Sequence, residues 1–521
     1  MIYDLSMYVK KTTMRRGEKT YTYATMVQAY RVGATIKHRT VARLGRVDKP
    51  FASFILPLIE KQQTQLASSA PYPAKLYALP MAIHSLWKNM GLSDIITGAL
   101  RNGQVKTNVS LLAELMTMGR ILHPDSKLSL TRWYASLYLP DALPKAIDVH
   151  AFYRSLDYLM EQKETIERHL YHKMKEKHLI KTTLLFYDLT SSYFEGEDCP
   201  IATYGYSRDH RSDRIQITLG LVLDSSGLPL YHEVFPGNML DQKTVQTIIG
   251  KLSTNFSFTN ILFVADKGML SEDNLAAITS KGYDYIISQS PRTDYEHNKE
   301  KIAQKDTWTE YTPALFFTKT ANGDILCYNS QTAKKAMATR ERKLAELTTY
   351  LAAEQAKETQ PKRKQTKAAI HDRIIRKLQK THATKYFDTK NDFTKKQEIL
   401  DKENLLDGVW ILKSSKQTLT PEEIISNYKQ EASIESAFRI IKDVIHLRPI
   451  YHYNTEHVKG HVFICVLAYL VTKLLEQKTG ETIKSLREKY MTAVIVQAKN
   501  PAEPDMIVGG ETLLQQCAVP L

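Results

Sequence analysis

Three acidic residues have the type and the placement that two-metal phosphodiester chemistry requires. Asp188 closes the apolar segment TTLLFYD, Asp266 closes ILFVAD, and each segment is typical of a buried strand. Open α/β sheets place their sites at the carboxyl ends of strands, so both carboxylates are expected at or near such an end. Glu435 lies in PEEIISNYKQEASIESAFRIIKD, whose periodicity predicts a helix beside that sheet. Three such carboxylates repel each other unless cations neutralise them, and two divalent ions about 3.5–4 Å apart can activate a water and stabilise the leaving oxygen.

The segment around Glu435 carries its own helix signals. Thr420 can cap the helix, Pro421 suits its first position, and Glu423 completes a capping box, so the helix is expected to begin near 421. On one continuous helix, five polar side chains fall within roughly 80° of arc: Tyr428, Glu431, Glu435, Arg439 and Lys442. An adjoining stripe is apolar: Ile434, Phe438, Ile441 and Ile445. One face is therefore expected to pack, while the other presents Glu435 to metal ions and Arg439 and Lys442 to neighbouring phosphates.

The order Asp188, Asp266, Glu435 resembles the DDE transposases of bacterial insertion sequences. The spacing Tyr428-x2-Glu431-x3-Glu435-x6-Lys442 is similar to the branch with the Y-x2-R-x3-E-x6-K signature, from which Glu431 departs because that signature has Arg there. The resemblance covers most of 180–475 and includes six further blocks: YDLTSSYFEG, YGYSRDHRSDRIQITLGLVLD, FPGNMLDQKT, VADKGMLS, DGVWILKSS and HLRPIYHYNTEHVKGHVFICVLAYLV.

This resemblance implies an RNase H-like catalytic domain, an α/β fold with a mixed sheet and flanking helices that an inserted subdomain interrupts. It implies cleavage at the ends of an insertion sequence, followed by attack of the freed 3′-OH on target DNA. Asp188 would bind both ions, and Asp266 and Glu435 would each complete one. The ions are expected to be Mg²⁺, for which Mn²⁺ can substitute. Tyr428 would either lie near the cleaved end or simply pack. The expected partners are double-stranded DNA and, on paired ends, a second copy of the chain; the expected location is the bacterial cytoplasm, at the nucleoid.

The blocks divide the chain into five regions. Residues 1–180 are expected to hold a hairpin that turns at Val32-Gly33-Ala34, followed by helices, and to bind the DNA ends. The catalytic domain is expected over 181–290 and 406–480, with an inserted subdomain over 291–405 and a tail over 481–521. The insertion begins like a hairpin with Asn322-Gly323 at the turn, and a helical part broken by Pro361 follows.

The second half of the insertion is strongly basic. Residues 357–396 contain 13 Lys and Arg against 4 Asp and Glu. Four of these cations are predicted to contact the DNA backbone: Lys362, Arg363, Lys364 and Lys367. The alternative is a helical hairpin whose charged face is simply solvated.

Composition agrees with a polyanionic partner. The chain of 521 residues has 71 Lys and Arg against 56 Asp and Glu, a net charge of +15. Its longest apolar run, 462–471, is about half of a bilayer span, so it predicts a buried helix and no membrane partner. His457 and His461 have the spacing of a zinc-binding helix, but solvated or DNA-facing imidazoles are the better account. A stand-alone RNase H-like nuclease and a domesticated DNA-binding protein remain alternatives.

Overall fold

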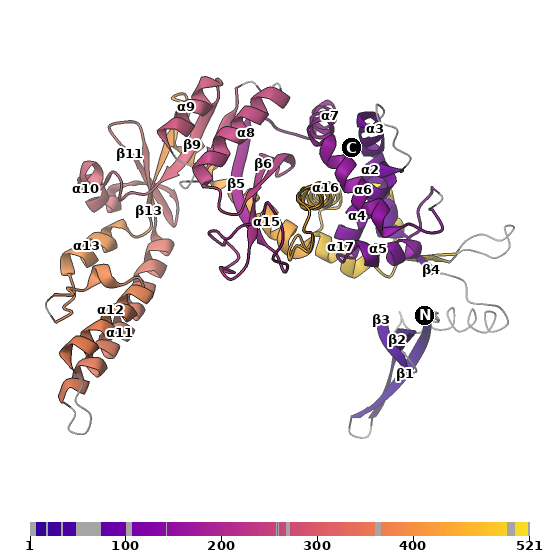
Figure 1. The fold of residues 1–521 in the computed structure, drawn as a ribbon, viewed down its shortest axis with the longest axis horizontal. Coiled ribbons are helices and arrows are strands. Elements are labelled where there is room, and N and C mark those ends of the chain that lie inside the picture. The colour runs from indigo at the N-terminus through magenta and orange to yellow at the C-terminus, as the bar shows by residue number, and fades with distance from the viewer. Residues whose placement is uncertain are drawn as a thin grey trace.

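The computed structural model describes most of the chain, and Figure 1 shows its course. The described residues are 7–16, 19–32, 35–47, 74–100, 107–141, 143–256, 258, 260–266, 271–359, 366–390, 392–496 and 506–518. An antiparallel sheet comes first, formed by β1 (Met7–Arg16), β2 (Lys19–Val32) and β3 (Thr35–Arg46). The predicted hairpin is present between β2 and β3, although Gly33 and Ala34 of its turn lie outside the described residues.

A bundle of helices follows, as the periodicity of the sequence predicts. Its members are α2 (Ala78–Asn89), α3 (Leu92–Ala99), α4 (Val109–Leu122), α5 (Lys127–Trp133), the 3₁₀ turn η1 (Tyr134–Ser136), α6 (Val149–Glu161) and α7 (Lys163–Glu176). The long helix α16 (Thr455–Thr479) packs against α2, α4 and α6, and it contains the apolar run predicted to form a buried helix. By length and hydropathy α16 alone among the described helices could cross a membrane, yet 89% of the qualifying window is buried inside the protein, as in a core helix.

Nine strands form the central sheet, in the order β10-β11-β12-β13-β9-β8-β5-β6-β7. Their bounds are β5 (Leu184–Tyr193), β6 (Gln216–Asp224), β7 (Pro229–Pro236), β8 (Leu262–Ala265), β9 (Asp284–Gln289), β10 (Thr309–Thr312), β11 (Leu315–Lys319), β12 (Ile325–Asn329) and β13 (Val409–Ser414). Strands β5, β8 and β9 are parallel to one another, and the other neighbours are antiparallel. Helices α8 (Asp241–Asn255) and α9 (Glu272–Ser280) make the connections around β8. The mixed α/β architecture is therefore confirmed.

The predicted insertion is only partly a separate unit. Its hairpin exists, with Gly323 at a φ of +89°, but β12 pairs with β13, so strands β10 to β12 extend the central sheet. A helical arm carries the rest of the insertion: α10 (Tyr295–Ala303), η3 (Lys305–Thr307), α11 (Ser330–Gln355), η4 (Ala356–Thr359), α12 (Lys367–Lys380), η5 (Thr384–Tyr386) and α13 (Gln397–Leu406). Leu347, Ile374 and Leu378 belong to a core of its own, and Figure 1 shows the arm projecting from the end of the sheet.

The predicted C-terminal tail is folded. It contains α17 (Ile483–Tyr490), β14 (Val494–Val496), β15 (Met506–Val508) and α18 (Glu511–Ala518). Strand β14 pairs with β4 (Ala74–Leu76) and with β15, and α18 packs on α2, where Leu513 and Cys517 are buried. The end of the chain thus completes the helical bundle near its beginning.

Candidate active site

The sequence predicts that Asp188 lies at or near the end of a strand. Instead, Asp188 lies in the middle of β5. The strand continues to Tyr193 because Thr190, Ser191 and Ser192, although polar, are buried and pair with β6. The Oδ1 atom of Asp188 accepts a hydrogen bond of 2.7 Å from the backbone N–H of Leu189. The carboxylate is therefore held on a strand that is paired on both sides.

Asp266 follows the last residue of β8 directly, as predicted. Tyr187 pairs with Ala265 in the parallel register of β5 and β8, so the next residues, Asp188 and Asp266, lie side by side. Neighbouring strands are about 4.8 Å apart, which brings the two carboxylates onto one small area of the sheet. The Ser288 hydroxyl on β9 donates a hydrogen bond of 3.0 Å to Oδ1 of Asp266 and helps to orient it.

The helix that carries Glu435 begins where the sequence predicts. Thr420 caps α14 (Pro421–Lys429), Pro421 is its first residue, and the capping box between Thr420 and Glu423 is present. The expectation of one continuous helix is wrong, because a second helix, α15 (Ala432–Arg439), starts after a break, and the π-helical turn η6 (Ile440–Val444) follows it.

Hydrogen bonds define this break. The N–H groups of Glu431, Ser433 and Ile434 each bond to a carbonyl three residues earlier, which is the tighter 3₁₀ pattern. The π turn is wider than an α-helical turn. Rotation per residue therefore differs on both sides of α15, and the 80° arc predicted for the polar residues does not hold. Glu435 lies in the first turn of α15, which packs on β5 through its buried apolar side.

Four carboxylates share this site. Burial, together with the charges of Asp266 and Glu435, raises the pKa of Asp188 to about 7, although the nearby Arg208 opposes that rise. Burial and the charges of Asp266, Asp188 and Glu435 raise the pKa of Glu431 to about 8. The structure thus brings the three predicted acids together and adds Glu431, the residue that departs from the family signature, as a fourth.

Tyr428 lies beside these acids. It interacts with Glu431 and Ser288 by side-chain hydrogen bonds, and burial raises its pKa above the usual value. Because Ser288 also bonds to Asp266, Tyr428 belongs to a polar network that links α14 to β9. The sequence left open whether Tyr428 packs or lies near the site. In the structure, Tyr428 is half-buried and contacts the acidic cluster.

The donor set of the site suits hard divalent cations. All four groups are carboxylates, and Mg²⁺ and Mn²⁺ prefer oxygen ligands. Burial and, to a lesser extent, the neighbouring negative charges raise the pKa values of Asp188 and Glu431, and bound cations would favour the charged carboxylates instead. Within the described residues, no group of three acidic, histidine or cysteine side chains is already arranged to hold a metal ion.

Lys442 is not presented beside Glu435 on an open helix face. It lies in the π turn with 9% of its side chain exposed, and its Nζ is 2.6 Å from Oδ1 of Asp209. Arg448 forms an ion pair with the same carboxylate, whose side chain is 2% exposed. Arg439 is exposed on α15, and its guanidinium donates a hydrogen bond of 3.5 Å to the Ser436 hydroxyl. Of the two predicted phosphate ligands, Arg439 therefore faces solvent and Lys442 is engaged inside the protein.

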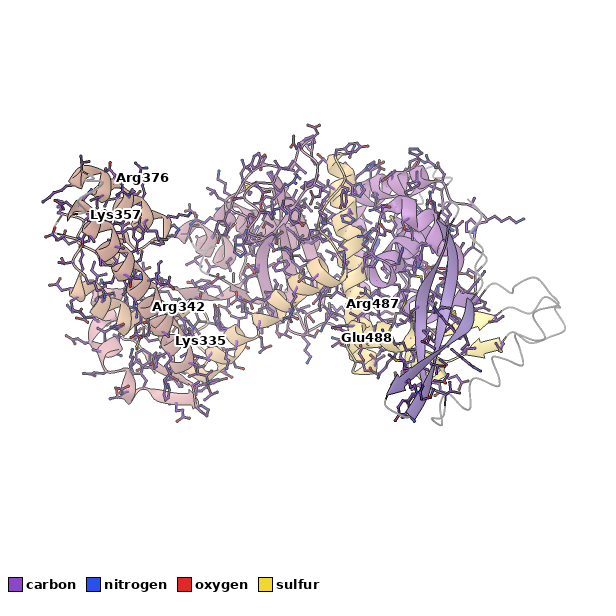
Figure 2. All side chains as sticks on the ribbon, turned by 90° about the horizontal axis from the view of Figure 1, so that it is seen from below. Lys335, Arg342, Lys357, Arg376, Arg487 and Glu488 are labelled. Carbon is purple, nitrogen blue, oxygen red and sulfur yellow. The ribbon has the colours of Figure 1, made fainter. Side chains whose placement is uncertain are left out.

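Lys362, Arg363 and Lys364 lie outside the described residues, whereas Lys367 is exposed at the start of α12, 3.3 Å from Glu358. The cations that face the interior of the arm have acidic partners: Arg340 pairs with Asp407, and Arg373 pairs with Glu354. Figure 2 shows basic residues spaced along the arm, and of these Lys335, Arg342 and Arg376 have no ion-pair partner within the described part of the chain. The arm thus pairs its inward-facing cations with acids and carries further cations on its surface.

The histidines do not form a zinc site within the described residues. His457 contacts Asp157 at 3.1 Å, whereas His461 and His452 accept from the buried Nζ of Lys127 at 3.2 and 3.1 Å. Burial and the nearby Arg120 lower the pKa of Lys127 to about 7. His452 and His461 therefore hold a lysine of the helical bundle, which is neither of the roles that the sequence suggested for these imidazoles.

Ser288 and Arg208 were missed from the sequence, whereas Asp209 could be named only as a weaker candidate acid. Ser288 gives no local signal, because a serine in a strand is common. Arg208 and Asp209 lie in the charge-rich block YGYSRDHRSDR, but their roles depend on contacts with residues 188, 241 and 442 to 448. Only the fold brings those segments together.

Comparison with known proteins identifies the family of the chain. A family model described as the transposase DDE domain matches residues 181–471, and one described as the IS1634 family transposase N-terminal domain matches residues 9–68. No curated protein matches the chain. The piggyBac transposase synaptic complex with hairpin DNA matches at 9% identity and a TM-score of 0.37, over 79% of this chain and 77% of that one. The Mos1 transposase paired-end complex with left transposon end matches at 13% identity and a TM-score of 0.16, over 33% and 57%.

Proposed function

We propose, because this chain belongs to the family defined by the transposase DDE domain, that it cleaves the ends of an insertion sequence and joins the freed 3′-OH to target DNA. Enzymes of this family cleave DNA with the help of divalent metal ions. The match to an insertion-sequence N-terminal domain supports the narrower class, and we infer that the central sheet with its helices is an RNase H-like domain.

The observation that supports the proposal best is the grouping of the acids at one place on the central sheet. Asp188 and Asp266 occupy adjacent positions of β5 and β8, and Glu435 reaches them from α15 closely enough to affect the pKa of Asp188. Clustering of like charges costs free energy, so such a cluster indicates a site for cations and the reaction that they assist.

The protein's own residues have distinct tasks in this proposal. Asp188 is central and would hold both ions, whereas Asp266 and Glu435 would each hold one. Bound ions would supply the activation of a water or 3′-OH and the neutralisation of the leaving oxygen. Ser288 fixes Asp266, and the break between α14 and α15 sets the direction from which Glu435 approaches. Mg²⁺ is the expected metal, with Mn²⁺ as a substitute.

DNA would be held by cations on both sides of this site. Arg439 is one turn from Glu435 on α15 and is free to reach a phosphate next to the reacting one. The arm adds Lys362, Arg363, Lys364 and Lys367, which we propose as backbone contacts. Lys442 would act through Asp209 and the segments that it joins. Tyr428 would order Glu431 beside the DNA end. The region 1–180 would recognise the ends, with two copies of the chain on paired ends in the bacterial cytoplasm.

A strand-transfer assay tests the function. The DNA that flanks the coding gene on both sides is supplied as two labelled fragments, together with Mg²⁺ and a supercoiled target plasmid. The expected product is the joint of a labelled 3′ end to the plasmid, and it should need both fragments. Cleavage of either fragment alone, without joints, would identify a stand-alone nuclease. Binding of the fragments without cleavage would identify a DNA-binding protein.

A further inference from the structure

Four tyrosines stand out on the surface in two short segments of the same form. In the segment Tyr204-Gly205-Tyr206, Tyr204 is 63% exposed and Tyr206 is 81% exposed. In the segment Tyr451-His452-Tyr453, Tyr451 is 72% exposed and Tyr453 is 76% exposed. Large apolar surfaces of this kind are rarely left open on a soluble protein without a partner. Each segment thus presents two aromatic faces to solvent.

The middle residue of each segment is anchored. A Cβ atom on Gly205 would lie 2.0 Å from the carbonyl oxygen of Gly237, so only glycine fits, and the Gln216 amide donates to the carbonyl of Tyr206 at 2.8 Å. His452 points inward and accepts from Lys127. The backbones of the flanking tyrosines are therefore fixed, while their rings are exposed to solvent.

The two segments are also tied to each other. Asp209, three residues after Tyr206, pairs with Arg448, three residues before Tyr451, and with Lys442. Thr203 pairs with Gln216, Gln216 with Tyr193, and Phe194 with Ile450. These three pairings separate the two segments by three strand spacings, which is a distance of roughly 15 Å. They form one frame at the end of β5, the strand that carries Asp188.

Cations accompany the rings on the side of the catalytic acids. Arg208 lies over the ring of Tyr206 at 5.7 Å and is close enough to Asp188 to lower its pKa. Arg211, in the same loop, lies over the ring of Tyr193 at 4.9 Å. Aromatic faces interleaved with arginines are typical of surfaces that bind unpaired nucleotides, because every base has a face that can stack and every nucleotide brings a phosphate.

We propose that these four residues, Tyr204, Tyr206, Tyr451 and Tyr453, form a stacking platform for unpaired bases of the DNA strands next to the cleavage site. The proposal rests on the proposed function, since it places single-stranded DNA beside the catalytic acids. The platform is tolerant of sequence, because stacking does not read base edges. Its fixed backbones lower the entropic cost of binding, so it holds bases that a frayed or cleaved end exposes.

Equilibrium binding in EDTA tests the platform separately from catalysis. The probes are a fluorescent 12-nucleotide oligo-dT and a blunt 20-bp duplex of unrelated sequence. The paired variants are Tyr204→Ala/Tyr206→Ala and Tyr451→Ala/Tyr453→Ala, each beside its Tyr→Phe counterpart, which keeps the aromatic face. Each Ala pair is expected to weaken oligo-dT binding about tenfold, since stacking is lost, and to change duplex binding less than twofold. The Phe pairs should bind both probes like the parent.

Three results would overturn the platform. Unchanged oligo-dT affinity in both Ala pairs would remove the stacking role, and an equal loss for duplex and oligo-dT would assign the surface to the duplex backbone. A change in sedimentation of the DNA-free protein on substitution would assign it to contact between copies of the chain. Tyr→Leu pairs, which keep apolar bulk without an aromatic face, replace any Ala pair that unfolds at lower temperature. Because no metal is present, a failure of strand transfer leaves this test unaffected.

Discussion

Two acidic centres, one beside α15 and one beside η6, differ in how their charges are balanced. At the proposed catalytic centre, Asp188, Asp266, Glu431 and Glu435 crowd together, and the pKa values of Asp188 and Glu431 rise well above normal. At the second centre, the single carboxylate of Asp209 is buried between the cations of Lys442 and Arg448. The first centre has more carboxylates than cations, whereas at the second centre two cations share the one carboxylate of Asp209.

The difference separates a binding site from a structural joint. Four carboxylates that repel each other destabilise the protein until a cation binds between them, so their arrangement indicates a cation-binding site. A carboxylate that already pairs with two cations has no need of a cation from solution, and its removal would leave Lys442 buried without a countercharge. Lys442 was predicted to bind a phosphate, but its side chain pairs with Asp209. We therefore expect Lys442 to affect the reaction by holding segments in place.

The largest effect is expected at the crowded centre. Asp188→Asn, Asp266→Asn and Glu435→Gln should each reduce cleavage with Mg²⁺ by at least about a thousandfold, because a metal ligand and its charge are lost. Binding of the DNA ends should change little. Cleavage and end affinity are measured side by side, with Glu422→Gln, an exposed acid in the first turn of α14, as the control. Near-normal cleavage by any of the three variants would remove that residue from the site.

The structural joint predicts a loss of stability instead. Asp209→Asn should destabilise the protein by about 3–5 kcal/mol, since Lys442 would remain buried without its countercharge, whereas Arg448 would keep its ion pair with Asp443. Asp213→Asn is the matched control, because Asp213 pairs with Arg211 on the surface and should matter little. Thermal unfolding measures both. If Lys442→Met added to Asp209→Asn lowered stability by the full sum of the two single changes, the pair would not form one unit.

The pH dependence of stability sharpens the same contrast. In metal-free protein, Asp188 and Glu431 hold protons up to about pH 7 and pH 8, whereas the unfolded chain releases them near pH 4. Stability from these protons is fully present at acid pH and is lost as pH rises through 7 and 8. The parent should therefore lose on the order of a few kcal/mol between pH 5.5 and 8.5 relative to Asp188→Asn/Glu431→Gln.

Unfolding midpoints in EDTA at the two pH values provide that comparison, and Mg²⁺ should restore the parent at pH 8.5. Glu422→Gln serves as control, since its exposed position gives no reason for a changed pH dependence. Parallel pH profiles for the parent and the double variant would show that the acids do not repel each other in the folded protein.

The sequence predicts what depends on local pattern. The capping box at Thr420, the buried run of α16, the hairpin at Gly323 and the strand before Asp266 follow from neighbouring residues, and all four are present. The break before α15 and the length of β5 depend on partners elsewhere, because Ser191 and Ser192 belong to a strand only when β6 pairs with them. The pairing of Lys442 with Asp209 spans 233 residues, and no local pattern predicts it.

The smallest effect is expected on the arm, where charge lies on the surface. Neutralising Lys362, Arg363, Lys364 and Lys367 together should weaken binding to all DNA sequences alike, because phosphate contacts carry no sequence information. Each lost phosphate contact should flatten the log–log salt dependence by up to about 0.9, whereas stability should hardly change because Lys367 is exposed and its pairing with Glu358 is a surface contact. The control is Lys299→Gln, an exposed lysine on α10 that pairs with Glu296.

The slope of binding affinity against salt concentration shows whether these cations contact DNA, because neutralising a cation that is only solvated leaves that slope unchanged. A slope equal to that of the parent and of Lys299→Gln would assign these four cations to solvent. DNA binding by the arm would then have to come from the cations on α11 and α12 that have no ion-pair partner within the described residues, such as Arg342 and Arg376.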